Sequence, residues 1–227
     1  AEVNGELGVV SVELARAIAG AAAEIEEGKL ADQFVVDVYQ AGAGTSFHMN
    51  VNEVIANRAL EILGKPRGDR GTISPNDHVN AGQSTNDTFP AAMRLACLEL
   101  VPPLAGALDL LLAALRQQAA AAGDAIKSGR THLQDAVPLR ISQEIGGWAA
   151  VVDAQRARLT AAAAPLHVLP LGGTAVGTGM NADLGRRAAT PSGANSGKAR
   201  KRPVVDRQRD DLGLYFATRH LFPAPRA

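Results

Sequence analysis

The chain has 227 residues, 46% of them hydrophobic, and its 23 Lys and Arg residues match 23 Asp and Glu residues, so the formal net charge is zero. A chain of this length can bury a substantial core, and its balanced charge excludes a global field that would attract nucleic acid or an anionic membrane. An anionic ligand would therefore need a local site.

The first part of the chain predicts two helices. Residues 11–27 place apolar side chains at helical spacing, with Ser11 as the N-cap and Gly28 as the C-terminal stop. A second helix is predicted over about residues 50–63, where the apolar positions again share one face. Residues 65–85 are rich in Gly, Pro, Asn, Asp and Ser, so they predict loops and turns.

Helical spacing returns at Thr88 and predicts two core helices end to end, with a break at Pro102-Pro103 and an end near Ala122. Cys97 lies in the first of them, so we expect a core thiol and, because it is the only cysteine, a reducing compartment. No apolar stretch approaches the roughly 20 residues that span a bilayer, and the start lacks a leader pattern. We expect a cytoplasmic protein without a membrane partner.

A further long helix is predicted over about 139–164, with Trp148 among its inward residues, and small β elements are predicted near 126–131 and 168–174. Long Ala- and Leu-rich helices joined by polar loops indicate a mainly α fold, a long-helix bundle with small β elements. Residues 183–227 lose the periodicity and are rich in Arg, Pro, Gly and Ser, so they predict a disordered tail.

Two polar loops precede predicted helices. In the first, 40–50, two glycines permit close backbone approach and Thr45 and Ser46 lead into a helix, an arrangement that can cradle a carboxylate or phosphate or can be a plain turn. In the second, 74–87, hydroxyl and amide side chains are dense. They can face an anion at a positive helix end, or simply cap the helix through Asn86 or Asp87.

A third polar loop, 127–138, contains His132 beside Thr131 and shortly before Asp135. A histidine titrates near neutral pH, so His132 can contact a carboxylate, relay a proton, or have a structural role. Other chemistries find little support. His48, Asp77 and His78 lack the spacing of a zinc site, and no phosphate-binding loop, dinucleotide fingerprint or serine-hydrolase elbow occurs.

Together these loops resemble the class II fumarase/aspartase family. The matching segments occur in order: Gly-Ala-Gly-Thr-Ser before Met-Asn-Val-Asn-Glu-Val-Ile-Ala-Asn, then Pro-Asn-Asp-His-Val-Asn, Gln-Ser-Thr-Asn-Asp and Gly-Arg-Thr-His-Leu-Gln-Asp-Ala. The glycine-rich residues 171–181 also resemble the family's next segment. The resemblance implies that 1–182 are the N-terminal domain and the start of an incomplete central helical bundle, with 183–227 as a non-matching tail.

Enzymes of this family remove a proton from the carbon beside a carboxylate while ammonia or water leaves the neighbouring carbon, giving fumarate. The resemblance implies a small dicarboxylate substrate (aspartate, malate or fumarate), a homotetramer, and no metal or organic cofactor. It implies that substrate carboxylates bind to Thr45, Ser46, Ser84, Thr85, Asn86 and Thr131, that His132 relays a proton or contacts a carboxylate, and that Asn76 and Asp77 belong to a peripheral anion-binding segment.

The particular residues in these motifs resemble aspartate ammonia-lyase more than fumarate hydratase. The family's later Gly-Ser-Ser-x-Met-Pro-x-Lys-x-Asn loop, whose serine is the expected base, does not occur in these residues. Family sites also combine loops from several subunits. We therefore expect weak or absent lyase activity from this chain alone; the alternative is a noncatalytic helical remnant that binds other lyase subunits.

Overall fold

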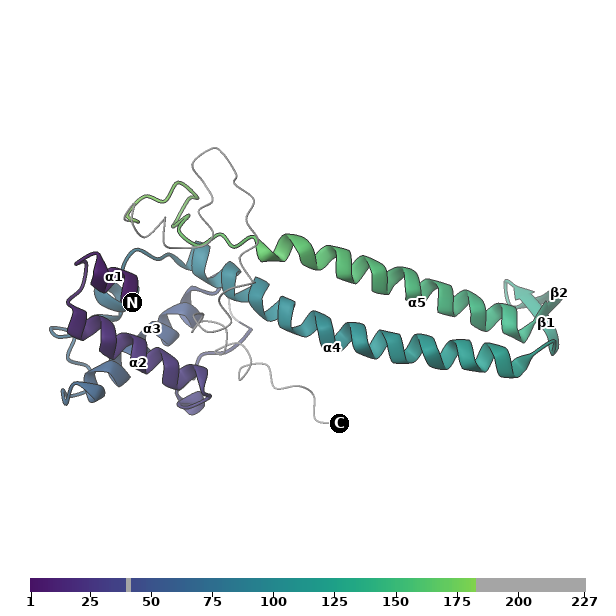
Figure 1. Ribbon diagram of the computed structural model, residues 1–227, viewed down its shortest axis with the longest axis horizontal. Coiled ribbons are helices and arrows are strands. Elements are labelled where there is room, and N and C mark those ends of the chain that lie inside the picture. Colours follow the sequence, from purple (N-terminus) through teal and green to yellow (C-terminus); the bar gives the residue numbers. More distant parts are fainter. Residues whose placement is uncertain (40–41, 183–227) are drawn as a thin grey trace. The chain divides into compact units, whose positions relative to one another are not determined.

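A computed structural model describes residues 1–39 and 42–182 (Figure 1). The chain divides into two compact units: Ala1–Ala96 with the chain from His167 onward, and Cys97–Leu166. The predicted tail and the start of the first polar loop lie outside the described residues. The elements in chain order are α1 (Glu2–Glu6), α2 (Val12–Glu26), α3 (Thr45–Ile62), α4 (Thr85–Ala122), β1 (Ile126–Thr131), β2 (Gln134–Arg140) and α5 (Ile141–Ala163), with short helical turns at Ala31–Gln33, Pro75–Val79 and Ala164–His167.

The first unit has its own apolar core between α2 and α3. Ser11 caps α2, as predicted, and its side chain accepts a hydrogen bond from the Leu14 N–H. Alanines on both helices let α2 and α3 approach closely, and the side chain of Ile73, from the loop after α3, fills the remaining space. The cluster comprises Ala17, Ile18, Ala21, Ala56, Ala59, Leu60, Ile73 and Val79.

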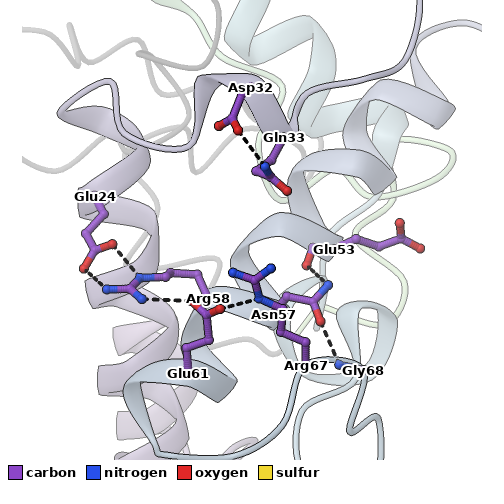
Figure 2. Close-up of polar contacts among 9 residues, drawn as sticks. All are labelled: Glu24, Asp32, Gln33, Glu53, Asn57, Arg58, Glu61, Arg67 and Gly68. Atoms are coloured by element: carbon purple, nitrogen blue, oxygen red, sulfur yellow. Dashed lines mark hydrogen bonds and ion pairs between the residues drawn. The ribbon is translucent and has the colours of Figure 1, made fainter.

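An ion-pair network joins the solvent-facing sides of α2 and α3 (Figure 2). The Arg58 guanidinium donates to both carboxylate oxygens of Glu24, at 2.6 and 2.9 Å, and to Glu61 at 2.8 Å. Glu61 also accepts from Arg67. This bidentate geometry fixes the rotation of one helix against the other more strongly than a single exposed ion pair would.

The predicted break at Pro102-Pro103 is wrong, because α4 continues through both prolines. A proline inside a helix removes one backbone hydrogen bond, and here the apolar periodicity on both sides outweighs that loss. Cys97 on this helix is exposed rather than in the core. The expectation that no apolar stretch approaches the length of a membrane span is wrong for α4, which by length and composition alone is apolar enough to cross a membrane, with a window of mean hydropathy 1.8.

The second unit pairs the later part of α4 with α5. Arg156 of α5 donates to both oxygens of Asp109 at 2.8 and 2.9 Å, and Arg116 donates to Asp153 at 3.1 Å. Asp109 lies among the leucines of α4, so this long apolar helix has a charged contact with its neighbour α5. Such a contact is typical of a helix in a water-exposed bundle. The predicted inward position of Trp148 is wrong, since this residue is 55% exposed.

The predicted strand at Ile126–Thr131 is confirmed, and it pairs antiparallel with β2, where the sequence predicts only a loop and the start of a helix. The connecting residues, His132 and Leu133, both have positive φ, 47° and 60°, as a tight two-residue hairpin requires. The predicted β element near Val168–Thr174 is wrong: these residues form turns and irregular structure. The chain is thus mainly α-helical, with long helices and one small hairpin among the described residues, which agrees with the predicted fold class.

Candidate functional site

The N-terminus of α4 is capped by its own polar motif. The Ser84 hydroxyl accepts from the Asn86 N–H at 3.2 Å, and the Asp87 carboxylate accepts from the Ser84 N–H at 3.0 Å. This reciprocal arrangement is close to a capping box, except that the Ser84 hydroxyl accepts from the second helical N–H and not from the third. Capping is therefore shared by Ser84 and Asp87, and the Thr85 and Asn86 side chains at the positive end of the helix are left for other contacts.

Asp87 connects this helix end to a glycine-rich loop far along the chain. The residue is 2% exposed, and one carboxylate oxygen accepts from the Gly172 N–H at 3.1 Å and the Thr174 N–H at 2.8 Å. The other oxygen also accepts from the Thr88 hydroxyl at 3.0 Å. The Asn86 amide donates to the Ala175 carbonyl at 2.7 Å. A buried carboxylate with this many donors holds two loops in one fixed arrangement.

His48 on α3 reaches the same helix end. The residue is 3% exposed, and its ring Nδ1 lies 2.8 Å from the Thr85 hydroxyl oxygen. Burial lowers the pKa of His48 below its ordinary range, and the neighbouring Gln83 side chain and Asp87 carboxylate only partly oppose this. The ring is therefore neutral near pH 7. Among the described residues, His48 Nε2 and the Thr174 hydroxyl are buried polar atoms without a hydrogen-bond partner.

The first polar loop lies beside the second. α3 begins at Thr45, about five residues before the predicted start, so Thr45 and Ser46 belong to its first turn, and both are exposed. Gly44 has φ +84°, and a Cβ there would lie 2.6 Å from the Phe89 ring of α4. Only glycine fits this conformation and this approach. The structure therefore brings Thr45 and Ser46 to the same region as Ser84, Thr85 and Asn86.

The predicted peripheral anion segment forms a π-helical turn, Pro75–Val79, within the first unit. The Ser74 hydroxyl donates to the Asp77 carboxylate at 2.8 Å, and the Ser74 N–H donates to His78 Nδ1 at 2.8 Å. Asn76 and Asp77 are both exposed. These contacts stabilise the turn itself, and the carboxylate of Asp77 adds negative charge to the predicted anion segment.

Thr131 and His132 belong to the second unit, at the turn between β1 and β2. Both are exposed, and the His132 side chain makes no hydrogen bond to any described residue. The polar network expected around it reduces to an exposed ion pair between Arg130 and Asp135, at 3.1 Å. Thr131 and His132 thus lie at the tip of the hairpin, in a different unit from the other predicted carboxylate-binding residues.

Asp87 and His48 contact the predicted site residues, and the sequence patterns did not identify these contacts. From its position alone, Asp87 is a possible cap, and His48 is an unsupported zinc ligand. A usable signal was present in each case: Asp87 stands three residues after Ser84, the spacing of a capping box, and His48 stands one helical turn after Thr45. Within residues 1–39 and 42–182, no three His, Cys, Asp or Glu side chains gather as metal ligands would.

The capped α4 end thus holds hydroxyl and amide side chains against a glycine-rich loop on a long-helix fold. A lyase family model matches residues 1–203, and the chain belongs to this family. The relatives by sequence and by structure place it among the fumarate lyases.

Among the curated relatives, class II fumarate hydratases of Bordetella parapertussis and Thermus aquaticus are 50% and 52% identical to it over 183 residues, or 80% of this chain. A solved structure described as a fumarate lyase:delta crystallin from Brucella melitensis bound to cobalt is 49% identical, covers 81% of this chain and has a TM-score of 0.73. A class II fumarase from Schistosoma mansoni is 38% identical, covers 82% of this chain and has a TM-score of 0.71.

The chain spans about 40% of the length of these relatives: 40% and 39% of the two hydratases, and 40% and 39% of the two solved chains. The names of the curated relatives favour fumarate hydratase, whereas the amino-acid sequences of the motifs favour aspartate ammonia-lyase. Residues such as Thr85 in Gln-Ser-Thr-Asn-Asp do not by themselves separate two enzymes that bind nearly the same dicarboxylate.

Proposed function

We propose that this chain carries the dicarboxylate-binding loops of a class II fumarate hydratase, which adds water to fumarate to give malate. The observation that supports this best is the end of α4, where Asp87 holds Thr85 and Asn86 beside the Gly172–Thr174 loop. The curated relatives with half of their aligned residues identical to this chain carry the hydratase name. Aspartate ammonia-lyase, which the amino-acid sequences of the motifs favour, is the second candidate.

The binding chemistry follows from charge. Fumarate and malate each carry two carboxylates. In the reverse reaction, malate loses a proton from the carbon beside one carboxylate, which adds further negative charge to that carboxylate before the hydroxyl group leaves the neighbouring carbon. Donors that are already fixed before the charge develops stabilise it at little reorganisation cost. The Thr85 hydroxyl, the Asn86 amide and the positive end of α4 are such donors in the first unit, with Thr45 and Ser46 beside them.

We further propose that Thr131 and His132 complete the site of another copy of the chain. They stand on the exposed β1–β2 turn, suited to contact a neighbouring molecule. The second unit also exposes large apolar side chains on α4 and α5, among them Leu104, Leu110 and Val151. Exposed apolar surface of this kind favours self-association. The family resemblance makes a tetramer the expected assembly.

The most informative experiment measures binding and turnover separately. Isothermal titration calorimetry of the purified chain with fumarate, malate and aspartate reports binding, and the ultraviolet absorbance of fumarate reports turnover. We expect binding of fumarate and malate ahead of aspartate, with little or no turnover, because the serine loop of the family is not among these residues.

Each outcome separates two interpretations. Preferential aspartate binding would replace hydratase by aspartate ammonia-lyase, and absence of any dicarboxylate binding would favour the noncatalytic remnant. Robust turnover of malate would contradict the expectation that the chain needs further elements. Sedimentation of the same sample reports the oligomeric state, with a stable monomer contradicting the proposed assembly.

A further inference from the structure

The buried side chain of His48 lies beside the proposed carboxylate site without contributing a group to it. Its Nδ1 is 2.8 Å from the Thr85 hydroxyl oxygen, and its Nε2 has no hydrogen-bond partner among the described residues. Only 3% of the residue is exposed, so water does not reach these atoms freely. Whether His48 or Thr85 donates the hydrogen bond between them therefore decides whether the Thr85 hydroxyl proton is free for another acceptor.

Two arrangements of protons satisfy this contact. If Thr85 donated to Nδ1, the neutral ring would carry its proton on Nε2, and the Thr85 oxygen would offer only lone pairs. The Gln83 side chain is near enough to raise the pKa of His48, but Nε2 has no partner in hydrogen-bond geometry, so this buried N–H donor would be unpaired. If Nδ1–H donates to Thr85, the unpaired atom is an acceptor, and the Thr85 proton is free. Unpaired buried N–H donors are the rarer defect in proteins, so the second arrangement is favoured.

A doubly protonated ring would also donate to Thr85, but it would place a charge in a buried setting. Burial lowers the pKa of His48, and the Gln83 side chain and Asp87 carboxylate only partly oppose this effect. The neutral ring with its proton on Nδ1 is thus the form that fits the surroundings. It directs the Thr85 hydroxyl proton away from His48.

We propose that His48 is a positioning residue that orients the Thr85 hydroxyl as a donor to a substrate carboxylate. The inference rests on the proposed function, in which Thr85 binds that carboxylate. The resulting relay runs from Nδ1–H to the Thr85 oxygen and from the Thr85 O–H to the anion, so each hydrogen bond polarises the next. No proton is transferred, and His48 does not touch the substrate.

A ¹⁵N NMR spectrum tests directly which ring nitrogen of His48 carries the proton. The whole chain, labelled with ¹⁵N-histidine, gives ring-nitrogen shifts that distinguish a protonated from a bare nitrogen, and the signals of His48 are those lost in the His48→Asn variant. We expect the proton on Nδ1 near pH 7. A proton on Nε2 alone, with the Gln83 side chain turned to accept it, would overturn the inference, whatever the binding data show.

A matched pair of variants tests the consequence for binding. The amide nitrogen of an asparagine side chain occupies the place of Nδ1, whereas that of a glutamine side chain occupies the place of Nε2. We therefore expect His48→Asn to bind fumarate nearly as well as the wild type, and His48→Gln to bind it roughly tenfold more weakly, the effect of one hydrogen bond to a charged group.

Unfolding measurements separate positioning from stability, because both variants alter the same buried ring. Similar losses of stability with different fumarate affinities support positioning. Equal affinities for the two variants, or affinity losses that follow stability, would overturn it. If the wild-type chain binds no dicarboxylate at all, the proposed function fails and this role of His48 fails with it; that outcome differs from one in which the wild type binds and the variants do not differ.

Discussion

The two units bury their apolar residues very differently. The first unit encloses a core between α2 and α3 in which Ala21, Ala59 and Ile73 are 0% exposed. Within Cys97–Leu166, which the structure describes completely, Leu112 and Ala149 are the only buried apolar residues. Hydrophobic burial stabilises a unit in proportion to the apolar area removed from water. The first unit thus has the means to fold by itself, while the second presents apolar helices suited to further partners.

Truncation of a core residue tests this difference with the largest expected effect. Leu60 is 1% exposed in the α2–α3 core, so Leu60→Ala should lower the free energy of unfolding by about 2–5 kcal/mol through lost contacts and a cavity. Leu110 on α4 is 75% exposed, and Leu110→Ala should cost less than about 0.5 kcal/mol. Urea unfolding measures both, and similar losses would contradict the comparison.

Replacing the buried Asp87 carboxylate should have the second-largest effect on the stability of the first unit. Asp87→Asn removes the charge that accepts the Gly172 and Thr174 N–H groups, and it should cost roughly 1.5–3 kcal/mol. The amides of these two residues should then exchange with solvent faster. The control is Asp153→Asn in the second unit, whose exposed ion pair with Arg116 predicts little change. Unchanged amide exchange at Gly172 and Thr174 would show that Asp87 does not hold this loop.

Two glycines should respond to alanine with opposite signs. Gly44→Ala introduces a Cβ at φ +84° and 2.6 Å from the Phe89 ring, so it should destabilise the first unit by about 1–3 kcal/mol. Gly106 lies within α4 with nothing within 4 Å of an added Cβ, so Gly106→Ala should stabilise that helix by up to about 1 kcal/mol. Thermal unfolding followed by circular dichroism gives both signs; stabilisation by Gly44→Ala would contradict the close approach of the Phe89 ring to Gly44.

The smallest expected effect concerns pH and the Arg58 network. The hydrogen bond from Arg58 is the main cause that lowers the pKa of Glu24, and hydrogen bonds from Arg58 and then Arg67 lower the pKa of Glu61. Because the folded-state pKa values lie below the unfolded ones, this stabilisation is present above the ordinary glutamate pKa of about 4.3 and is lost as the pH falls through the folded-state values.

Arg58→Gln should therefore flatten the acid side of the stability curve. The control is Arg70→Gln, because Arg70 is exposed and its nearest nitrogen is 3.8 Å from Glu53. Unfolding free energies measured between about pH 3 and pH 7 compare the two variants with the wild type. An acid slope that Arg58→Gln leaves unchanged would assign the pH dependence to other carboxylates.

Much of the candidate site could be predicted from the sequence, because it consists of short polar segments at helix starts. Thr45, Ser84 and Thr85 are recognisable in this way, and the structure brings them into one region. The role of Asp87 could not be predicted, since its partners Gly172 and Thr174 lie 85 and 87 residues away in sequence. The β element predicted near Val168–Thr174 failed for the same reason: the N–H groups of Gly172 and Thr174 bond to a carboxylate, not to a neighbouring strand.

Motif order and apolar periodicity are local properties of the chain, so they were enough to indicate the family and the main helices. The N-cap of α2 at Ser11 and the strand at Ile126–Thr131 could be predicted from the same local properties. Packing between distant segments was needed to establish that His48 is buried against Thr85. Burial depends on what other segments bring to a residue, and the neutral form of a histidine follows from that burial.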